Sequence, residues 1–156
     1  MAKEIERKFL VEGSGWRMQA DDGIAISQFY VATGEGRSAR IRIIDGTGAK
    51  LTLKFGGAVR ERDEFEYAIP LEDAQAMERF AVGNVIEKTR HHISHRGYVY
   101  EVDLFKHALA GLVIAELETA DDVADADLPS WAGREVTGEA AFYNASLAMN
   151  GVPDTL

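Results

Sequence analysis

The chain has 156 residues, of which 46% are hydrophobic and 28% are charged, so it is long enough to form one domain around a substantial core. Its formal net charge of −9 disfavours binding to nucleic acids or anionic membranes, unless the cations are gathered in one place. The absence of cysteine excludes disulfides and thiolate metal sites and fits a reducing compartment. Since the chain also has no apolar run of about 20 residues and no signal-like N-terminal segment, we expect a cytoplasmic protein.

The sequence predicts a mainly β protein, because charged and apolar side chains alternate along one segment after another. The first of these segments covers residues 3–11 and places Glu4, Glu6 and Lys8 on one face. Seven more follow between turn signals, at 24–33, 38–44, 49–55, 60–69, 85–94, 98–105 and 112–119. Apolar residues at helical spacing predict helices over 70–81 and 138–149.

The charges are segregated by strand, which is the most informative feature of the pattern. Cations share a strand face in one set: Arg40, Arg42, Lys54, Lys88 and Arg90. Anions share a strand face in another: Glu4, Glu6, Glu64, Glu66, Glu101, Asp103, Glu116 and Glu118. For any single strand, an ordinary antiparallel sheet with one face in water is the simpler explanation. Because like charges two residues apart gain nothing from each other, however, we expect something else to neutralise them.

Closure of about eight strands into a barrel would bring both sets of charges into one lumen, which would then need bound ions or water. Carboxylates there suit Mg²⁺ or Mn²⁺, which prefer oxygen ligands, and arginine and lysine suit phosphate oxygens. The pattern therefore favours a site that holds a divalent metal and a polyanion together.

Short motifs in a fixed order carry a resemblance to a known family. They are Glu4-Ile5-Glu6-Arg7-Lys8, Arg40-Ile41-Arg42, Leu51-Thr52-Leu53-Lys54, Glu64-Phe65-Glu66, Lys88-Thr89-Arg90, Tyr100-Glu101-Val102-Asp103 and Ala115-Glu116-Leu117-Glu118. The ordered set resembles the CYTH superfamily, the triphosphate tunnel metalloenzymes, over nearly the whole chain. The resemblance implies one tunnel domain over residues 1–156. Its fold would be α+β but mainly β, a closed eight-stranded antiparallel barrel with a charged lumen and a few helices outside.

The resemblance also implies roles for individual residues. The cations would bind the substrate phosphates: Lys8, Arg40, Arg42, Lys54, Lys88 and Arg90. The foremost metal ligands would be Glu4, Glu6, Glu116 and Glu118, with Glu64, Glu66 and Asp103 in or next to the metal site. A metal-activated water would then attack the terminal phosphorus in line. Tyr30 or Lys8 is the candidate catalytic base, provided that the surrounding cations lower the pKa of either group.

Some of these residues also have a purely structural explanation. A cross-strand ion pair with Arg62 or Lys54 is the alternative for three carboxylates, Glu64, Glu66 and Glu101, and we prefer it for Glu101. Tyr30 has an alternative as a packing residue with a hydrogen-bonded hydroxyl.

Within the family, a short chain with no obvious inserted segment for a nucleobase or thiamine resembles the inorganic tripolyphosphatases. The resemblance therefore implies metal-dependent hydrolysis of tripolyphosphate to pyrophosphate and phosphate, with Mg²⁺ or Mn²⁺. The alternatives are a nucleoside or thiamine triphosphatase, a class IV-type adenylate cyclase, and a module that binds polyphosphate without cleaving it. We expect a small-molecule triphosphate as partner, with no nucleic acid and no membrane, and we leave a monomer and a homodimer open.

Overall fold

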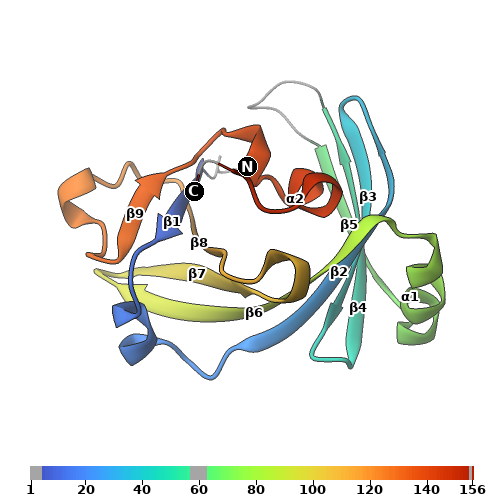
Figure 1. Ribbon diagram of the computed structural model, residues 1–156, viewed down its shortest axis with the longest axis horizontal. Coiled ribbons are helices and arrows are strands. Elements are labelled where there is room, and N and C mark those ends of the chain that lie inside the picture. Colours follow the sequence, from blue (N-terminus) through green and yellow to red (C-terminus); the bar gives the residue numbers. More distant parts are fainter. Residues whose placement is uncertain (1–4, 57–62, 155) are drawn as a thin grey trace.

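The computed structural model describes residues 5–56, 63–154 and 156, which form one large curved sheet with a few short helices (Figure 1). All neighbouring strands are antiparallel, in the order β5-β4-β3-β2-β6-β7-β8-β1-β9. Their bounds are β1 (Ile5–Val11), β2 (Ile24–Gly34), β3 (Arg37–Ile44), β4 (Gly48–Phe55), β5 (Asp63–Ile69), β6 (Val82–His95), β7 (Tyr98–Phe105), β8 (Val113–Thr119) and β9 (Ala132–Glu135). The eight expected strands are therefore present, with small differences at their ends.

The expectation of a closed eight-stranded barrel is wrong, because the described residues form an open sheet of nine strands. The added strand β9 pairs with β1, with Phe9 opposite Glu135. It therefore occupies the edge of β1 that would have to pair with the other end of the sheet to close a barrel. At the other end of the sheet, β5 pairs only with β4 among the described residues. Gly133 permits the close approach of β9, since a Cβ there would lie 2.7 Å from the carbonyl oxygen of Leu10. Four residues are too few to show a clear alternation, so sequence analysis missed this strand.

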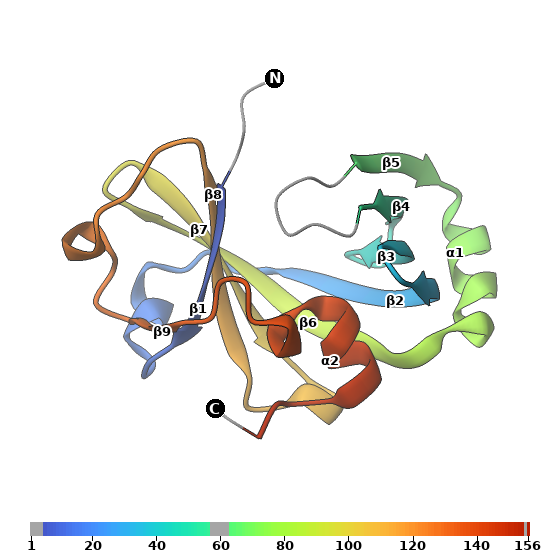
Figure 2. The ribbon, with the colours of Figure 1, turned by 90° about the horizontal axis from the view of Figure 1, so that it is seen from above.

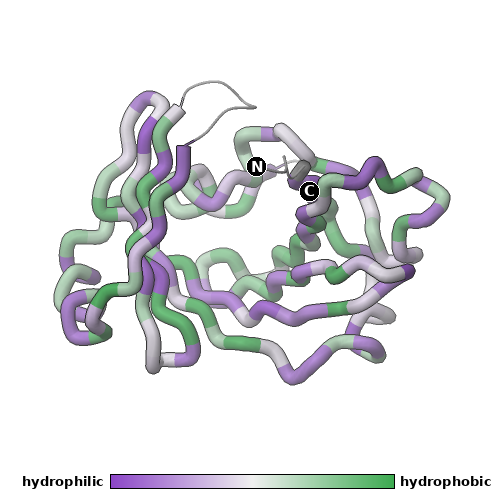
Figure 3. Tube along the Cα trace, turned by 180° about the vertical axis from the view of Figure 1, so that it is seen from behind, coloured by the Kyte–Doolittle hydropathy of each residue, from purple (hydrophilic) through white to green (hydrophobic). Residues whose placement is uncertain are grey.

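The sheet bends strongly, so that β3, β4 and β5 lie on one side of the molecule and β1, β8 and β9 on the other (Figure 2). Residues that are directly paired across antiparallel strands point to the same face. The registers therefore place the charged motifs on one shared face, which we call the inner face. The directly opposed pairs on this face include Lys8 and Glu116, Glu6 and Glu118, Gln28 and Arg42, Tyr30 and Arg40, and Arg90 and Asp103. Figure 3 shows the accompanying alternation of hydrophilic and hydrophobic residues along the strands.

Apolar residues pack in three clusters that hold the sheet in this shape. Two lie on the outer face: one contains Phe29 and Ile41 under helix α1 (Leu71–Met77), and the other contains Phe9 and Trp16, the latter from the 3-10 turn η1 (Gly15–Gln19). The third lies at one end of the inner face, where helix α2 (Asn144–Asn150) packs on the sheet; it includes Tyr30, Phe105, Ile114, Phe142 and Leu147. The charged residues occupy the rest of the inner face, so this face has an apolar end and a polar end.

The expected helices are shorter than the periodicity predicts. The segment 70–81 contains α1 and then a 3-10 turn, η2 (Glu78–Phe80). The segment 138–149 is divided into a 3-10 turn, η5 (Ala140–Phe142), and α2, because Tyr143 between them has extended backbone angles, with φ −69° and ψ 141°. Two further 3-10 turns are η3 (His107–Leu109) and η4 (Asp125–Asp127). Among the described residues, no helix has the length and apolar character needed to cross a membrane.

Gly83 fixes how closely β6 approaches α2, and this closeness can be tested by substitution. Its φ is +76°, and a Cβ at this position would lie 2.7 Å from the carbonyl oxygen of Ala148. Gly97 also has a positive φ, +83°, but a Cβ there would meet nothing within 4 Å. Both Gly83→Ala and Gly97→Ala should cost roughly 1–2 kcal/mol for the left-handed backbone. We predict a larger loss of unfolding free energy for Gly83→Ala in urea denaturation, because α2 must also shift; equal losses would contradict the close approach.

Candidate functional site

The inner face contains polar side chains that are almost completely removed from solvent. Each is less than 9% exposed: Lys8, Gln28, Arg40, Thr52, Lys88 and Asp103. A buried charge is costly unless it is paired, hydrogen-bonded or bound to a metal. The partners of these groups therefore define what the site is able to bind.

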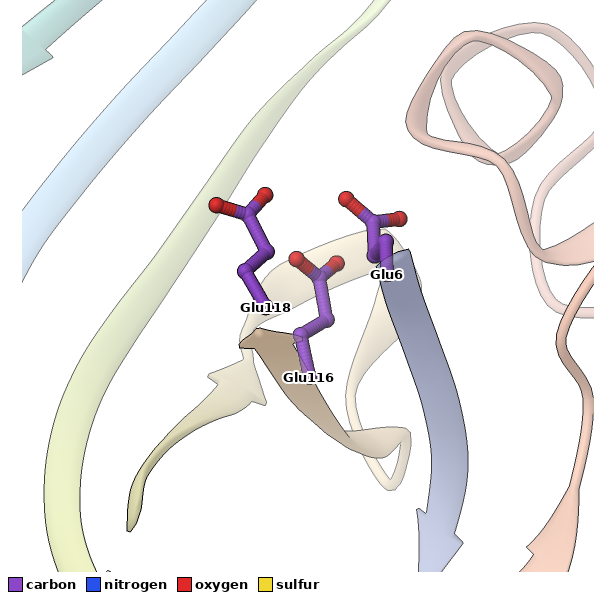
Figure 4. Close-up of side chains that lie close together, drawn as sticks. All are labelled: Glu6, Glu116 and Glu118. Carbon is purple, nitrogen blue, oxygen red and sulfur yellow. The ribbon is translucent and has the colours of Figure 1, made fainter. Parts of the chain in front are cut away.

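Three glutamates form an acidic cluster where β1 and β8 pair. Glu6 lies directly opposite Glu118, and Glu116 follows on the same face of β8. One carboxylate oxygen from each glutamate lies within 4.8 Å of the others, and Figure 4 shows the three carboxylates side by side. The Lys8 Nζ is 3.6 Å from Glu116 and 3.8 Å from Glu6. Within the described part of the chain, this is the only group of three possible metal ligands, while Glu4 lies outside the described residues.

The crowding of these carboxylates changes the titration of one of them, Glu118. Burial, followed by the neighbouring Glu6 carboxyl, raises the pKa of Glu118 to about 7, with Glu116 and Glu101 adding to the effect. Two carboxylates that share a site cannot both ionise at their usual pKa, because each charge opposes the other. The single ammonium of Lys8 is therefore too little positive charge for three glutamates. A divalent cation with oxygen ligands would supply the missing charge.

Asp103 on β7 connects two cations of β6. Its carboxylate accepts two hydrogen bonds from Arg90, at 2.8 Å and 2.9 Å, and one of its oxygens lies 2.7 Å from Lys88 Nζ. Although burial opposes the charge, Lys88 and Arg90 hold the pKa of Asp103 well below its usual range. Because both oxygens are occupied by cations, Asp103 does not join the acidic cluster and instead positions Lys88 and Arg90.

Lys88 has a property that sequence analysis did not anticipate. Its side chain is fully buried, and this burial lowers the pKa of Lys88 to about 8 against the opposing charge of Asp103, with Arg90 and Arg42 lowering it further. Burial therefore makes the Lys88 ammonium easier to deprotonate than an ordinary lysine, while the adjacent Asp103 carboxylate opposes the loss of its proton. The alternation in β6 predicted the face of Lys88 but carried no signal for its burial.

Tyr30 does not meet the condition that its expected role as a base required. Burial raises the pKa of Tyr30 and outweighs the opposing effects of Arg40, Arg42 and Lys8. The pKa is raised because the ring packs into the apolar cluster under α2, so the condition for Tyr30 as a base is not met and its catalytic role stays a prediction. Lys8, the other candidate base, lies next to the glutamates, with its Nζ 3.5 Å from the carbonyl oxygen of Phe142.

Two neutral side chains orient the arginines of β3. Gln28 Oε1 accepts a 2.9 Å hydrogen bond from Arg42 Nε, and Thr52 Oγ1 accepts one of 3.3 Å from Arg40 Nη2. Burial and the nearby Arg40 lower the pKa of Arg42 to about 10. Among the described residues, neither arginine has a carboxylate within 4.0 Å, so both retain positive charge for an external anion. No role was predicted for Gln28 or Thr52, although both share the charged face of their strands and Thr52 lies within the motif Leu51-Thr52-Leu53-Lys54.

The remaining predicted site residues lie nearer the β5 edge. Lys54 lies opposite Glu64, and Lys50 forms a 3.7 Å ion pair with Glu66. Glu64 and Glu66 are exposed and do not join the acidic cluster.

The cross-strand ion pair that we preferred for Glu101 is present, but with a different partner. Its carboxylate lies 2.9 Å from Arg90 Nη1 rather than pairing with Lys54, and Arg62 lies outside the described residues.

The chain is similar to known proteins over nearly its whole length. A family model described as the CYTH domain matches residues 2–147. The inorganic triphosphatase of Acetivibrio thermocellus is 38% identical over 151 residues and matches 96% of each chain. The inorganic triphosphatase of Nitrosomonas europaea is 32% identical over 155 residues, which cover 94% of this chain and 97% of that one.

Solved structures give the same relationship. The crystal structure of an inorganic triphosphatase superposes with a TM-score of 0.71 at 28% identity, covering 98% of this chain and 99% of the other. From the family match and these relatives, we conclude that the chain belongs to the CYTH domain family.

Proposed function

We propose that this protein is a divalent-metal-dependent inorganic triphosphatase that hydrolyses tripolyphosphate to pyrophosphate and phosphate. The observation that carries the proposal is the division of charge on the inner face: a three-glutamate cluster is short of cations, while Arg40 and Arg42 have no carboxylate partner among the described residues. A metal–triphosphate complex would supply both missing charges. Relatives over almost the full length of the chain are named inorganic triphosphatases, which supports this substrate.

Glu6, Glu116 and Glu118 are the proposed metal ligands, together with Glu4, and the ion would be Mg²⁺ or Mn²⁺. The close carboxylates and the raised pKa of Glu118 fit such an ion, because Lys8 is the only cation within 4.0 Å of the three carboxylates among the described residues. When bound, the ion would neutralise phosphate charge and help to activate a water molecule. A direct metal-binding role for Glu64, Glu66 and Asp103 stays a prediction.

The proposed phosphate-binding groups are the inner-face cations Lys8, Arg40, Arg42, Lys54, Lys88 and Arg90. Arginine binds phosphate oxygens through two parallel N–H donors, and Gln28 and Thr52 orient Arg42 and Arg40 for this contact. Lys88 is the proposed acceptor of the proton that the attacking water loses, because burial lowers its pKa to about 8. Tyr30, whose pKa is raised, would act as a neutral hydroxyl.

Phosphate release from a panel of substrates tests the reaction. We predict that tripolyphosphate is hydrolysed with Mg²⁺ or Mn²⁺, that EDTA abolishes the activity, and that ATP, thiamine triphosphate and pyrophosphate react more slowly. The expected preference follows from a site built from charged groups for phosphate and metal. Tight binding of tripolyphosphate without any product, or the formation of cyclic AMP from ATP, would contradict the proposal.

Two substitutions should separate metal binding from phosphate binding. We predict that Glu6→Gln removes metal dependence together with turnover. Arg42→Ala should mainly raise the KM for tripolyphosphate by about 10- to 100-fold, since a hydrogen bond to a charged group contributes about 1.5–3 kcal/mol. Steady-state kinetics over a metal titration provide the measurement. Arg96→Ala is the control, because this exposed arginine lies in the β6–β7 turn and pairs with Asp127 of η4. Wild-type turnover in Glu6→Gln would remove Glu6 from the metal site.

The raised pKa of Glu118 predicts a pH-dependent stability of the metal-free protein. A carboxyl whose pKa is about 7 when folded and near 4.3 when unfolded binds its proton more tightly in the folded state, so stability falls as the pH rises towards and through 7. Thermal unfolding in EDTA should therefore show a higher Tm for Glu118→Gln than for the wild type at pH 8.5, and a smaller difference at pH 5. Mg²⁺ should raise the Tm of the wild type more than that of the variant at pH 8.5. An identical response of both proteins to pH would exclude crowding of this carboxyl.

A further inference from the structure

Arg90 contacts two carboxylates through its three nitrogens, and these carboxylates differ in how exposed they are. Its Nε and Nη2 bind Asp103, whose side chain is 3% exposed and is also held by Lys88. Its Nη1 binds Glu101 at 2.9 Å, and that side chain is 29% exposed. A phosphate oxygen that binds Arg90 on the side of Nη1 occupied by Glu101 must compete with this carboxylate, which is the more exposed of the two partners.

Glu101 has a second neighbour in His92, which lies directly opposite it on β6. The same Oε2 that contacts Arg90 lies 3.6 Å from His92 Nε2. On the other side of the ring, His92 Nδ1 lies 3.4 Å from Asp21 Oδ2. Imidazole is the side chain whose charge changes most readily between pH 5 and 8, so Glu101 lies between a permanent cation and a titratable one.

Asp21 is held firmly in the turn before β2. Its Oδ1 accepts hydrogen bonds from the backbone N–H of His92 at 3.0 Å and of Gly23 at 3.1 Å. The bond from the His92 backbone is the largest of the effects that lower the pKa of Asp21. Asp21 is therefore a fixed negative charge next to the His92 ring, which it orients through the contact with Nδ1.

Other charged groups around this position act on Glu101 rather than directly on the ring. Glu118 of β8 repels Glu101 electrostatically, and Arg90 attracts it. His91, the neighbour on β6, is directed towards Asp21, with its Nδ1 3.0 Å from the Asp21 carbonyl oxygen and 3.7 Å from Oδ1, and its ring contacts Trp16. Among the described residues, Glu101 thus has only Arg90 and His92 as ion-pair partners.

We propose that His92 is a positioning residue of the triphosphate site: in its protonated form it takes Glu101 from Arg90 and so frees Arg90 Nη1 for a phosphate oxygen. Glu101 then serves as a stand-in anion that holds Arg90 while the site is empty. The inference rests on the proposed function. Its consequence follows from linkage: substrate binding and proton uptake by His92 favour each other, so affinity for tripolyphosphate rises as the pH falls through the imidazole range.

Kinetics of matched histidine variants provide the first test. His92→Gln should raise the KM for tripolyphosphate about two- to fivefold at pH 6, the range expected for a partly exposed ion pair, with kcat and the KM at pH 8.5 unchanged. The readout is the difference in KM between His92→Gln and the wild type, because tripolyphosphate and Glu118 also titrate in this pH range and affect both proteins. His95→Gln is the control, since His95 lies on the same strand but contacts the Asp127 carbonyl oxygen instead. Coincident KM profiles of His92→Gln and the wild type would overturn the inference.

Glu101→Gln provides a second test with the opposite expected sign. Removal of the carboxylate charge weakens the competitor for Arg90, so the KM at pH 8.5 should fall about two- to fivefold. A higher KM would show that Glu101 holds Arg90 in its productive position, and would overturn the inference.

An NMR titration of the histidine rings needs no turnover. With tripolyphosphate added in EDTA, the titration midpoint of His92 should move to higher pH, while that of His95 stays in place. An unchanged midpoint for His92 in the presence of bound tripolyphosphate would overturn the inference. Absence of phosphate release by the wild-type protein with either metal would instead overturn the proposed function, so the two failures are distinguishable.

Discussion

The inner face depends on one buried interaction, the contact of Asp103 with Lys88 and Arg90. Removal of three charges from water costs more than their mutual attraction usually returns, so such a group is weak evidence for stability. Its evident effect is geometric, since the carboxylate fixes a guanidinium and an ammonium side by side at the centre of β6. Without Asp103, two like charges would face each other with no counter-ion between them.

From this centre the charges separate towards two ends of the site. On the β1–β8 side, Glu6 and Glu116 share the ammonium of Lys8, and the pKa of the adjacent Glu118 is raised to about 7. On the β2–β3 side, Arg40 and Arg42 are held by neutral oxygens. The first end is complementary to a metal ion and the second to phosphate, which is why a single metal–polyphosphate ligand accounts for both.

The apolar end of the inner face contacts residues of the charged site and changes their properties. Helix α2 and the turn before it pack on Tyr30 and Phe105, and the carbonyl oxygen of Phe142 reaches Lys8. Burial by this cluster raises the pKa of Tyr30, although three cations lie near it. Burial has the opposite effect on Lys88, whose pKa it lowers, because in both cases it disfavours the charged form.

The sequence alone determined which residues form strands and which of them share a face, because side-chain direction alternates with a period of two and depends only on neighbouring residues. The family also followed from the sequence, since it rests on motifs in order. The tertiary structure decided that the sheet stays open, that a ninth strand pairs with β1 and that the last helical segment breaks at Tyr143. It also decided the pKa shifts of Tyr30 and Lys88. Each depends on which distant segments pack together and how much water they exclude, and a local pattern of charged and apolar residues contains no measure of either.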